Sequence, residues 1–575
     1  MRGLLKLSEL PYFEKWIILG FIIGIFIGLS AIAFDFLYRL FYTIFLIDIL
    51  HLSLPKPLNP TFSYTVNPLL ILVVTFGGLI SGLLTMLSPE ASGGGVDFAI
   101  KAYHNRGKIR KRVAFIELFS SSILLGTGGS AGDLGPMGLI GASIASLITE
   151  VLGLTPEDIR KAIAIGIGSG IGVIFKAPIG GALLSAEILY RRDFESEVIL
   201  PSMISSATAY SIYGLYSGFQ PIFGIYPYTF SPLRLPLYAI LGILIGLTTI
   251  LFVRIYHEIS NMFRKMKVPQ YVKTTLGSFL SSILLLFLPE LIGTGYGWDY
   301  ILEAGKINEI NTYGIPLLLF LLLIAVAKMI SSSFTIGSGG SGGIEAPSFE
   351  IGALIGAIVG IIFHNLFPSI VPFIAPFVII GMLALFGAGA KAPISVMIIV
   401  TEMTYSLQLL PGEMVAVAIA YVISGKHTLY PSQFPTRKES PVHRSEYEIP
   451  VMLKVKIRQC KLQDVKINPD EKVEKVIELM KEYGLTSMPV VDKNSTFIGI
   501  VFYQSIEGKE GRIGDYVIRG VPTVSLNSNL EDAWEVIART RSSYVIVTEG
   551  EKFIGIVSLE EMLKCYEKRI KRKKE

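Results

Sequence analysis

The glycine clusters are the residues of this chain whose type and spacing best suit the binding of a ligand. Four of them lie beside apolar segments, at Gly93–Gly95, Gly128–Gly132, Gly166–Gly172 and Gly337–Gly343. Where a glycine loop opens a helix, the first backbone N–H groups lack intrahelical partners and the helix dipole adds partial positive charge. Such helix ends hold an anion without a full opposing charge, so a bound ion can also leave. The clusters therefore predict a binding place for a small anion.

Close packing of membrane helices is the main alternative explanation of these glycines. It suits an isolated cluster, but two of the clusters lead into a proline in matching surroundings, Pro136 and Pro347. A nucleotide-binding loop is a poorer explanation, because no cluster carries the Lys-Ser/Thr ending of a P-loop. Anion binding is therefore the preferred interpretation.

Carboxylates accompany the clusters. Asp97, Asp133, Glu345 and Glu350 lie within or beside the glycine-rich motifs. Aspartate near a helix start is favourable in itself, so the two aspartates are interpreted as capping helices or facing water. A carboxylate inside an apolar segment is costly, which singles out Glu345 as a functional residue. Together the acids also leave open a site for a cation or a proton-linked substrate.

The elements that position these motifs are predicted to be membrane helices. With 51% hydrophobic residues, 17% charged residues and a mean hydropathy of +0.57, the chain is too apolar for a soluble protein. Apolar runs recur from Trp16 to about Ile423, and several are short or cut by glycine or proline. Broken segments persist in a bilayer only where protein or a water-filled cavity satisfies their backbone, so they indicate a permeation site. The first run is too long for a cleaved signal peptide.

The membrane part contains an internal repeat. The matching motifs are, in chain order, Gly132–Pro136 with Gly343–Pro347 and Lys176–Ile179 with Lys391–Ile394. They imply two homologous halves, about 15–215 and 230–425. Glu187 and Glu402 follow the second pair of motifs at the same spacing. Their symmetry predicts structural pairing, with a lysine or with backbone donors.

The composition becomes polar after the membrane part, where short β-rich runs alternate with amphipathic helices. The predicted parts are, in chain order, a membrane domain (1–435), a linker (436–455), two soluble repeats (456–510 and 511–567) and a basic tail (568–575). The basic tail predicts a cytoplasmic C-terminus rather than a nucleic-acid partner. Cys460 and Cys565 support neither a disulfide framework nor a zinc site.

At these motifs the sequence resembles the ClC family of chloride channels and transporters. Pro89–Asp97 looks like the family's GSGIP region, Gly132–Pro136 like its GxEGP region, Gly343–Pro347 like its GxFxP region, and Gly425–Tyr430 like the segment with the pore tyrosine. The resemblance implies an all-α, multi-pass cell-membrane protein of two inverted repeats that forms a homodimer with one ion pathway per subunit. The implied pathway residues are Gly93, Gly94, Gly95, Leu134, Gly135, Gly343, Ile344, Glu345, Ala346 and Tyr430.

Several side chains depart from the family pattern. Gly94 stands in place of the chloride-coordinating serine, and Asp97 in place of a proline. Leu134 and Ile188 replace the external gating glutamate and the internal proton-transfer glutamate, and neither can titrate. Chloride/proton exchange by the family's usual route is therefore not expected. Glu345 replaces the pore phenylalanine and is the repeat equivalent of Leu134, which predicts a relocated gate.

The soluble repeats resemble a tandem pair of CBS domains, an α/β module that often binds adenine nucleotides. Ser558 and Glu561 stand where the family grips ribose, so they are possible nucleotide ligands. The first copy has Phe502 and Ser505 there and is expected to have lost binding. A purely structural CBS pair is an equal alternative, and no other cofactor is expected.

These observations imply a channel or transporter for chloride or another small anion, in contact with membrane lipid. No covalent chemistry is indicated, so an enzyme is not expected, and no metal site is predicted. Two alternatives stay open. One is a proton-linked or cation transporter that uses relocated acids such as Glu345, and the other is a membrane sensor without transport that acts through the CBS pair.

Overall fold

The apolar runs of the sequence become helices in the computed structural model, which describes residues 7, 10–105, 107–226, 229–443, 451–540 and 542–571. The chain divides into two units, Met1–His443 and Arg444–Glu575. Residues 444–450 of the predicted linker and 572–575 of the predicted basic tail lie outside the described residues.

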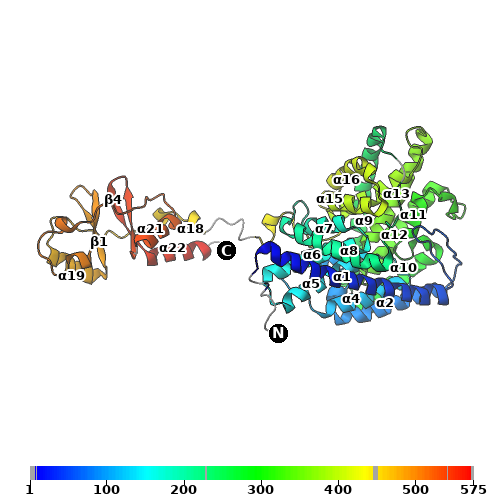
Figure 1. Ribbon diagram of the computed structural model, residues 1–575, viewed down its shortest axis with the longest axis horizontal. Coiled ribbons are helices and arrows are strands. Elements are labelled where there is room, and N and C mark those ends of the chain that lie inside the picture. The colour runs from blue at the N-terminus through cyan, green and yellow to red at the C-terminus, as the bar shows by residue number, and fades with distance from the viewer. Residues whose placement is uncertain are drawn as a thin grey trace. The chain divides into compact units, whose positions relative to one another are not determined.

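The first unit is helical throughout. Its helices are α1 (Tyr12–Tyr42) with the π-helical continuation η2 (Thr43–Ile49), α2 (Leu69–Leu87), α3 (Val96–His104), α4 (Arg112–Gly126), α5 (Leu134–Val151), α6 (Pro156–Ile174), α7 (Pro178–Glu187), α8 (Ile199–Ser217), α9 (Leu235–Lys265), α10 (Gln270–Phe287), α11 (Tyr296–Glu303), α12 (Leu317–Gly337), α13 (Glu345–Leu366), α14 (Ala375–Ala390), α15 (Pro393–Thr404) and α16 (Leu410–Ser424). Figure 1 shows the long α1 lying beside α4, α5, α6 and α8.

Full-length and short helices are mixed, as the sequence predicts. Among the described residues, 8 helices are long and apolar enough to cross a membrane. Others are much shorter: α11 has 8 residues and α15 has 12. A helix of that length cannot by itself span about 30 Å of hydrocarbon. The predicted class, a mostly helical polytopic membrane protein, is confirmed.

The two halves make reciprocal contacts, as a twofold relation between them requires. At the centre, Gly132 and Gly343 exchange backbone hydrogen bonds of 2.7 Å in both directions. Glu187 accepts from the amides of Ile394 and Ser395 at the start of α15 (3.2 and 2.7 Å). The repeat equivalent of Glu187 makes the reciprocal contact with the first half.

Glu402, the repeat equivalent of Glu187, accepts from the amides of Ile179 and Gly180 at the start of α7 (3.1 and 2.8 Å). Each glutamate therefore satisfies the free N–H groups of a helix in the opposite half. The predicted structural pairing is confirmed, and its partners are backbone donors.

The second unit repeats one small module. Its elements are α18 (Val451–Lys454), α19 (Val473–Tyr483), β1 (Ser487–Val491), β2 (Phe497–Phe502), α20 (Tyr503–Ile506), α21 (Leu530–Thr540), β3 (Tyr544–Glu549), β4 (Lys552–Ser558) and α22 (Leu559–Lys571). Strands β1 and β2 pair antiparallel, as do β3 and β4, and both pairs shift register at the same place, after Val490 and after Val547. The predicted α/β pair at the C-terminal end is confirmed.

The two cysteines of this unit are joined in the structure. Cys460 precedes the first module and Cys565 lies in α22, with a Cα–Cα distance of 5.6 Å and a disulfide between them. The sequence-based prediction of no disulfide is therefore wrong. The residues are 105 positions apart, and the folding of the tail alone brings them together.

Candidate functional site

Three of the four glycine clusters converge at the starts of three helices. The fourth, Gly166–Gly172, lies within α6 and packs closely against α5 and α7, so the prediction of an anion site is wrong for that cluster and close helix packing explains it. Gly95 precedes α3, Asp133 precedes α5 and Ile344 precedes α13, and none of them caps its helix with a side-chain hydrogen bond. The loops touch one another through their backbones: the amide of Gly342 donates to the carbonyl of Gly93 (3.4 Å). Gly95 needs its glycine here, because φ is +57° and a Cβ would lie 3.1 Å from the Gly135 carbonyl oxygen.

Glu345 occupies the point where these helix starts meet. It is the first residue of α13 and is 0% exposed. The hydroxyl of Tyr430 donates to its Oε1 (2.6 Å). Its other oxygen, Oε2, faces the backbone of Gly135 and Gly343, at the start of α5. The carboxyl group of Glu345 thus lies between a tyrosine hydroxyl and a helix N-terminus, a setting that favours an anion.

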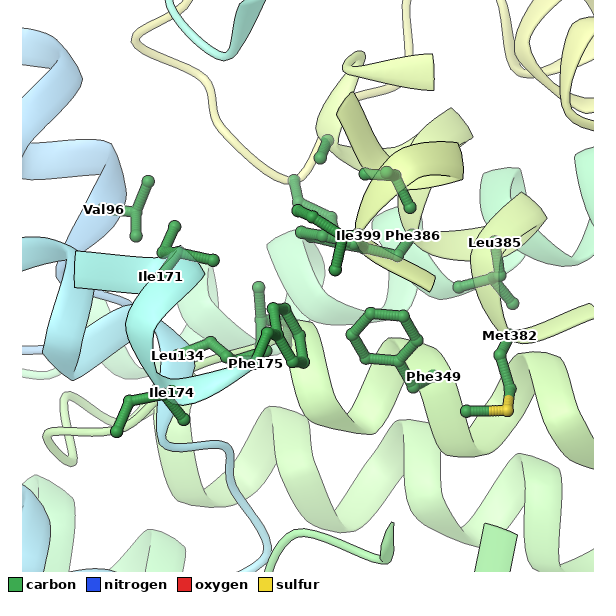
Figure 2. Close-up of a cluster of buried hydrophobic side chains, with 14 of the residues drawn as sticks. Val96, Leu134, Ile171, Ile174, Phe175, Phe349, Met382, Leu385, Phe386 and Ile399 are labelled. Carbon is green, nitrogen blue, oxygen red and sulfur yellow. The ribbon is translucent and has the colours of Figure 1, made fainter. Parts of the chain in front are cut away.

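The repeat equivalent of Glu345 is apolar. Leu134 is 0% exposed, and Figure 2 shows it beside Phe175 among buried hydrophobic side chains. The ring of Phe175 packs edge-on against Phe349 of α13 (5.2 Å between centroids). The first residue of α5 is therefore not titratable, in contrast to Glu345 at the first position of α13.

A cavity of about 1380 Å³ leads to the site. Gly93, Gly94, Gly95, Ile344 and Tyr430 all line it, so half of the predicted pathway residues border this space. The other five predicted pathway residues do not line the cavity and lie at or next to the starts of α5 and α13: Leu134, Gly135, Gly343, Glu345 and Ala346.

The charged residues of this cavity are mainly basic. Its lysines and arginines are Lys101, Arg191, Arg264, Lys273 and Lys426, and its acids are Glu90, Asp97 and Glu439. Five cationic against three acidic side chains give the cavity a positive potential, which raises the local concentration of anions.

The two aspartates of the glycine motifs bind other elements. Asp97 accepts from the amide and the hydroxyl of Ser432 (2.8 and 2.9 Å), which ties α3 to the segment after α16. Asp133 accepts from the hydroxyl of Tyr296 (2.9 Å) at the start of α11. Neither caps its own helix with its side chain, so the interpretation as helix caps is wrong.

Sequence reasoning missed a buried ion pair in the second half. Lys328 of α12 lies 2.6 Å from Glu350 of α13, and their side chains are 0% and 1% exposed. The repeat offers a signal for it. Counting back from Leu134 and from Glu345 by the same number of residues leads to Glu117 and Lys328, so the halves carry opposite charges at equivalent places.

In the second unit, the predicted nucleotide ligands do not line the cavity described there. Ser558 Oγ accepts from the amide of Glu561 (3.4 Å), at the start of α22. A cavity of about 300 Å³ instead adjoins Phe502, Arg519 and Tyr544. Burial raises the pKa of Tyr544 to about 12, against the opposing effect of its hydrogen bond with Ser487. Tyr544 therefore keeps its proton at neutral pH.

Comparison with known proteins agrees with this geometry. The family described as voltage gated chloride channel matches residues 76–425, which is more than half of the chain. The chain belongs to this family. The CBS domain family matches 460–506 and 513–568, so the chloride channel part is followed by a CBS pair.

Relatives and solved structures place the chain among chloride channel family proteins. An uncharacterized protein of Methanocaldococcus jannaschii is 30% identical over 341 residues, which are 59% of this chain and 78% of the relative. The H(+)/Cl(-) exchange transporter ClcA of Yersinia pestis is 27% identical over 376 residues, 62% of this chain and 77% of the relative.

Among solved structures, a slow cyanobacterial Cl-/H+ antiporter aligns with a TM-score of 0.60 and 25% identity, covering 71% of this chain and 93% of that one. A eukaryotic CLC transporter aligns with a TM-score of 0.56 and 18% identity, covering 96% and 98%, so that likeness concerns the fold alone.

Proposed function

We propose that this protein moves chloride or another small anion across a cell membrane, with the carboxylate of Glu345 as the gate. The observation that carries the proposal is the place of that carboxylate, between the Tyr430 hydroxyl and the start of α5 (2.6 Å to the hydroxyl). A carboxylate is itself a small anion, so its oxygens stand in for a transported ion. The same donors cannot serve both at once.

Gating follows from this competition. While Glu345 is ionised and bound to Tyr430, it fills the anion position. When it is protonated or turns aside, the hydroxyl and the backbone amides become free for chloride. The burial of Glu345 makes the neutral form accessible, because an ionised carboxylate without solvent is costly. Protons are therefore expected to open the pathway.

The basic cavity supports an anion over a cation as substrate. Its excess of lysine and arginine repels cations and attracts anions by long-range electrostatics. A cation transporter would need its acids to face the permeating ion, whereas Asp97 is engaged by Ser432. A sensor without transport is the remaining alternative, and a flux assay distinguishes it.

The test is flux through the full-length protein in liposomes with wild type and Glu345→Gln. Wild type is expected to pass chloride faster as the pH falls, and the reversal potential in a chloride gradient should have the sign of an anion pathway. Glutamine cannot ionise, so Glu345→Gln should pass chloride at a rate independent of pH. Unchanged pH dependence in Glu345→Gln would contradict the gate.

Glu413→Gln is the matched control. Glu413 is also 0% exposed in a membrane helix, and it accepts from Thr401 (3.3 Å), far along the chain from the glycine loops. This variant should keep the wild-type pH dependence. A reversal potential of cation sign would defeat the anion assignment, and failure to pass any of chloride, nitrate, fluoride or potassium would favour the sensor.

The same proposal includes a homodimer with one pathway per subunit and a cytoplasmic CBS pair. Membership of the chloride channel family supports both expectations. Cross-linking of single-cysteine variants in intact cells would test the dimer. Labelling of those cysteines from either side of the membrane would test where the CBS pair lies.

Adenine nucleotide at the CBS pair is a further part of the proposal. Two places compete for it: the predicted ligands Ser558 and Glu561, and the cavity beside Arg519 and Tyr544. Calorimetric titration of the full-length protein with ATP, ADP and AMP decides between them. Loss of binding in Glu561→Ala supports the first place, and loss in Arg519→Ala supports the second.

A further inference from the structure

A basic segment that the anion site does not use precedes α4. Four of the five residues in Lys108–Arg112 are lysine or arginine, and all four are exposed. The fifth, Ile109, is buried in the hydrophobic core, and its amide donates to the hydroxyl of Ser146 (3.3 Å). Val113, the residue after the segment, is buried too. The two apolar side chains anchor the segment and leave its cations on the surface.

Two of the four cations are engaged by acids of this chain. The ammonium of Lys108 lies 3.3 Å from the carboxylate of Glu150. The guanidinium of Arg110 donates to both carboxylate oxygens of Glu90. Glu90 also lines the basic cavity, so the segment lies beside that cavity. Lys108 and Arg110 therefore have structural roles.

The other two cations, Lys111 and Arg112, lack such partners. Within the described part of the chain, no carboxylate pairs with either side chain. Arg112 is the first residue of α4, Lys111 is the residue before it, and the first turn of the helix contains no acid. A cation is unfavourable at the start of a helix because of the helix dipole. Stabilisation of α4 therefore does not explain these two charges.

The exposed face of α4 beyond them is apolar. Phe115 is 65% exposed and Phe119 is 45% exposed. They follow Arg112 by three and seven residues, which places them on the same side of the helix. Met86 and Leu87, at the end of the neighbouring α2, are exposed as well. Exposed apolar side chains on a membrane protein suit contact with acyl chains, so two cations border a surface of that kind.

Helix α2 places the two cations at the edge of the membrane. It is one of the helices that are long and apolar enough to cross a bilayer, and it ends at Leu87. Figure 1 shows α4 beside it. Ser120, eight residues after Arg112, bonds to Ser81, six residues before Leu87 (2.9 Å). At about 1.5 Å of rise per residue, Arg112 lies within a helical turn of the level of Leu87, where lipid headgroups begin.

We propose that Lys111 and Arg112 bind the phosphate of an anionic phospholipid whose acyl chains lie against Phe115 and Phe119. Ammonium and guanidinium groups are the usual protein ligands of phosphate. A zwitterionic headgroup carries its own cation, whereas an anionic one gains from each lysine or arginine at the membrane surface.

A phospholipid also explains why the cations adjoin an apolar face, which a free phosphate would not contact. The lipid binds beside the wall of the basic cavity, because Arg110 holds Glu90 there. This inference does not depend on which ion the protein moves.

The experiment uses a tryptophan reporter on the proposed acyl surface. Full-length Phe115→Trp protein is reconstituted in phosphatidylcholine vesicles that contain increasing fractions of phosphatidylglycerol with brominated acyl chains, which quench a tryptophan on contact. The native tryptophans, Trp16, Trp298 and Trp534, give a background that is measured without the reporter and subtracted. Two cations should make brominated phosphatidylglycerol the better quencher, by roughly 30-fold over brominated phosphatidylcholine at low salt.

Variants made in the reporter protein locate the site. Lys111→Gln and Arg112→Gln should each lower the preference for phosphatidylglycerol about fivefold, and together they should remove most of it. Arg112→Lys keeps the charge and should retain the preference to within about twofold. All of these side chains are exposed, so the thermal unfolding midpoint in phosphatidylcholine should stay at the wild-type value.

Lys108→Gln is the matched control. It removes one positive charge from the same segment, but Glu150 already engages that charge, so the preference should change less than about twofold. A loss in Lys108→Gln equal to that in Arg112→Gln would show a diffuse effect of charge and would overturn the site.

The remaining outcomes also decide the inference. A preference that disappears in about 1 M salt supports binding by charge. Equal quenching by the two brominated lipids in the unaltered segment would overturn the lipid site. Relief of quenching by inorganic phosphate at constant ionic strength would show that Lys111 and Arg112 hold free phosphate, and would overturn it too.

Discussion

The two halves of the membrane unit share a backbone arrangement but differ in their charged side chains. Gly132 and Gly343 pair across the centre, and both lead into a helix start with free amides. Glu345 at the second helix start is ionisable, whereas its equivalent Leu134 is packed in an apolar cluster. The backbone arrangement is shared, but the residues at the first position of the two helices differ in whether they can ionise.

The neighbouring positions show the same asymmetry. In the second half, Lys328 and Glu350 form a buried pair (2.6 Å). Their equivalents in the first half are Glu117, which accepts from Ser121 (3.2 Å), and Leu139, which packs near Gly95. Backbone donors begin a helix in both halves, whereas the buried ion pair and the acid that we propose as the gate lie in the second half.

The largest effect is expected where the halves differ most in buried charge. Lys328→Met leaves Glu350 without its countercharge, so the free energy of unfolding should fall by about 3–5 kcal/mol. Glu117→Gln, at the equivalent place, keeps acceptors for Ser121 and should lose less than about 1.5 kcal/mol. Unfolding of both variants by titration with sodium dodecyl sulfate measures the difference. Equal losses would show that the difference in buried charge between the two halves does not affect stability.

Moving the acid between halves should change chloride binding. Glu345→Leu removes the carboxylate that competes for Tyr430, and a hydrogen bond to a charged group contributes about 1.5–3 kcal/mol, so chloride affinity should rise roughly tenfold to a hundredfold. Adding Leu134→Glu should restore part of the competition from the other helix start. Calorimetric titration of the purified protein with chloride at neutral pH measures both. An unchanged affinity in Glu345→Leu would place the anion elsewhere.

Alanine substitutions at Gly95 and Gly295 should have a smaller effect on stability. Gly95 and Gly295 both have positive φ (+57° and +86°), where an L-residue costs about 1–2 kcal/mol. A Cβ on Gly295 would also clash with the carboxylate of Glu350, whereas on Gly95 it meets Leu139 at 3.2 Å. Gly295→Ala should therefore lower the thermal unfolding midpoint more than Gly95→Ala does. The reverse order would mean that Glu350 moves aside without cost.

The smallest effects should be equal in the two halves. Ser341 bonds to Ser121 (2.9 Å), and the equivalent Ser130 bonds to Ser332 (3.1 Å). Removing either hydroxyl, in Ser341→Ala or Ser130→Ala, should cost about 1 kcal/mol. The same detergent unfolding curves measure both variants. If the two variants differ in unfolding free energy by more than about 1 kcal/mol, the two serine pairs do not contribute equally to stability.

Much of this protein could be predicted from its sequence, because the relevant signals are local. Apolar runs predicted the membrane helices, and repeated motifs predicted two halves and the pairing role of Glu187 and Glu402. The unusual acid Glu345 marked the residue that we propose as the gate. For Asp97 and Asp133 the helix-cap alternative was wrong, because an aspartate beside a helix start looks like a cap whether or not a partner from another element is near.

Sequence alone determined the membrane class, the repeat, three of the four glycine clusters as helix starts and the identity of the unusual acid, since hydropathy, turn residues and spacing act within a few residues of one another. Tertiary structure decided which side chains meet: Glu345 with Tyr430, Lys328 with Glu350, Tyr296 with Asp133, and Cys460 with Cys565. These partners lie far apart in the chain. Their contact depends on how antiparallel repeats cross at the centre and how the tail folds on itself, and no local pattern encodes those distances.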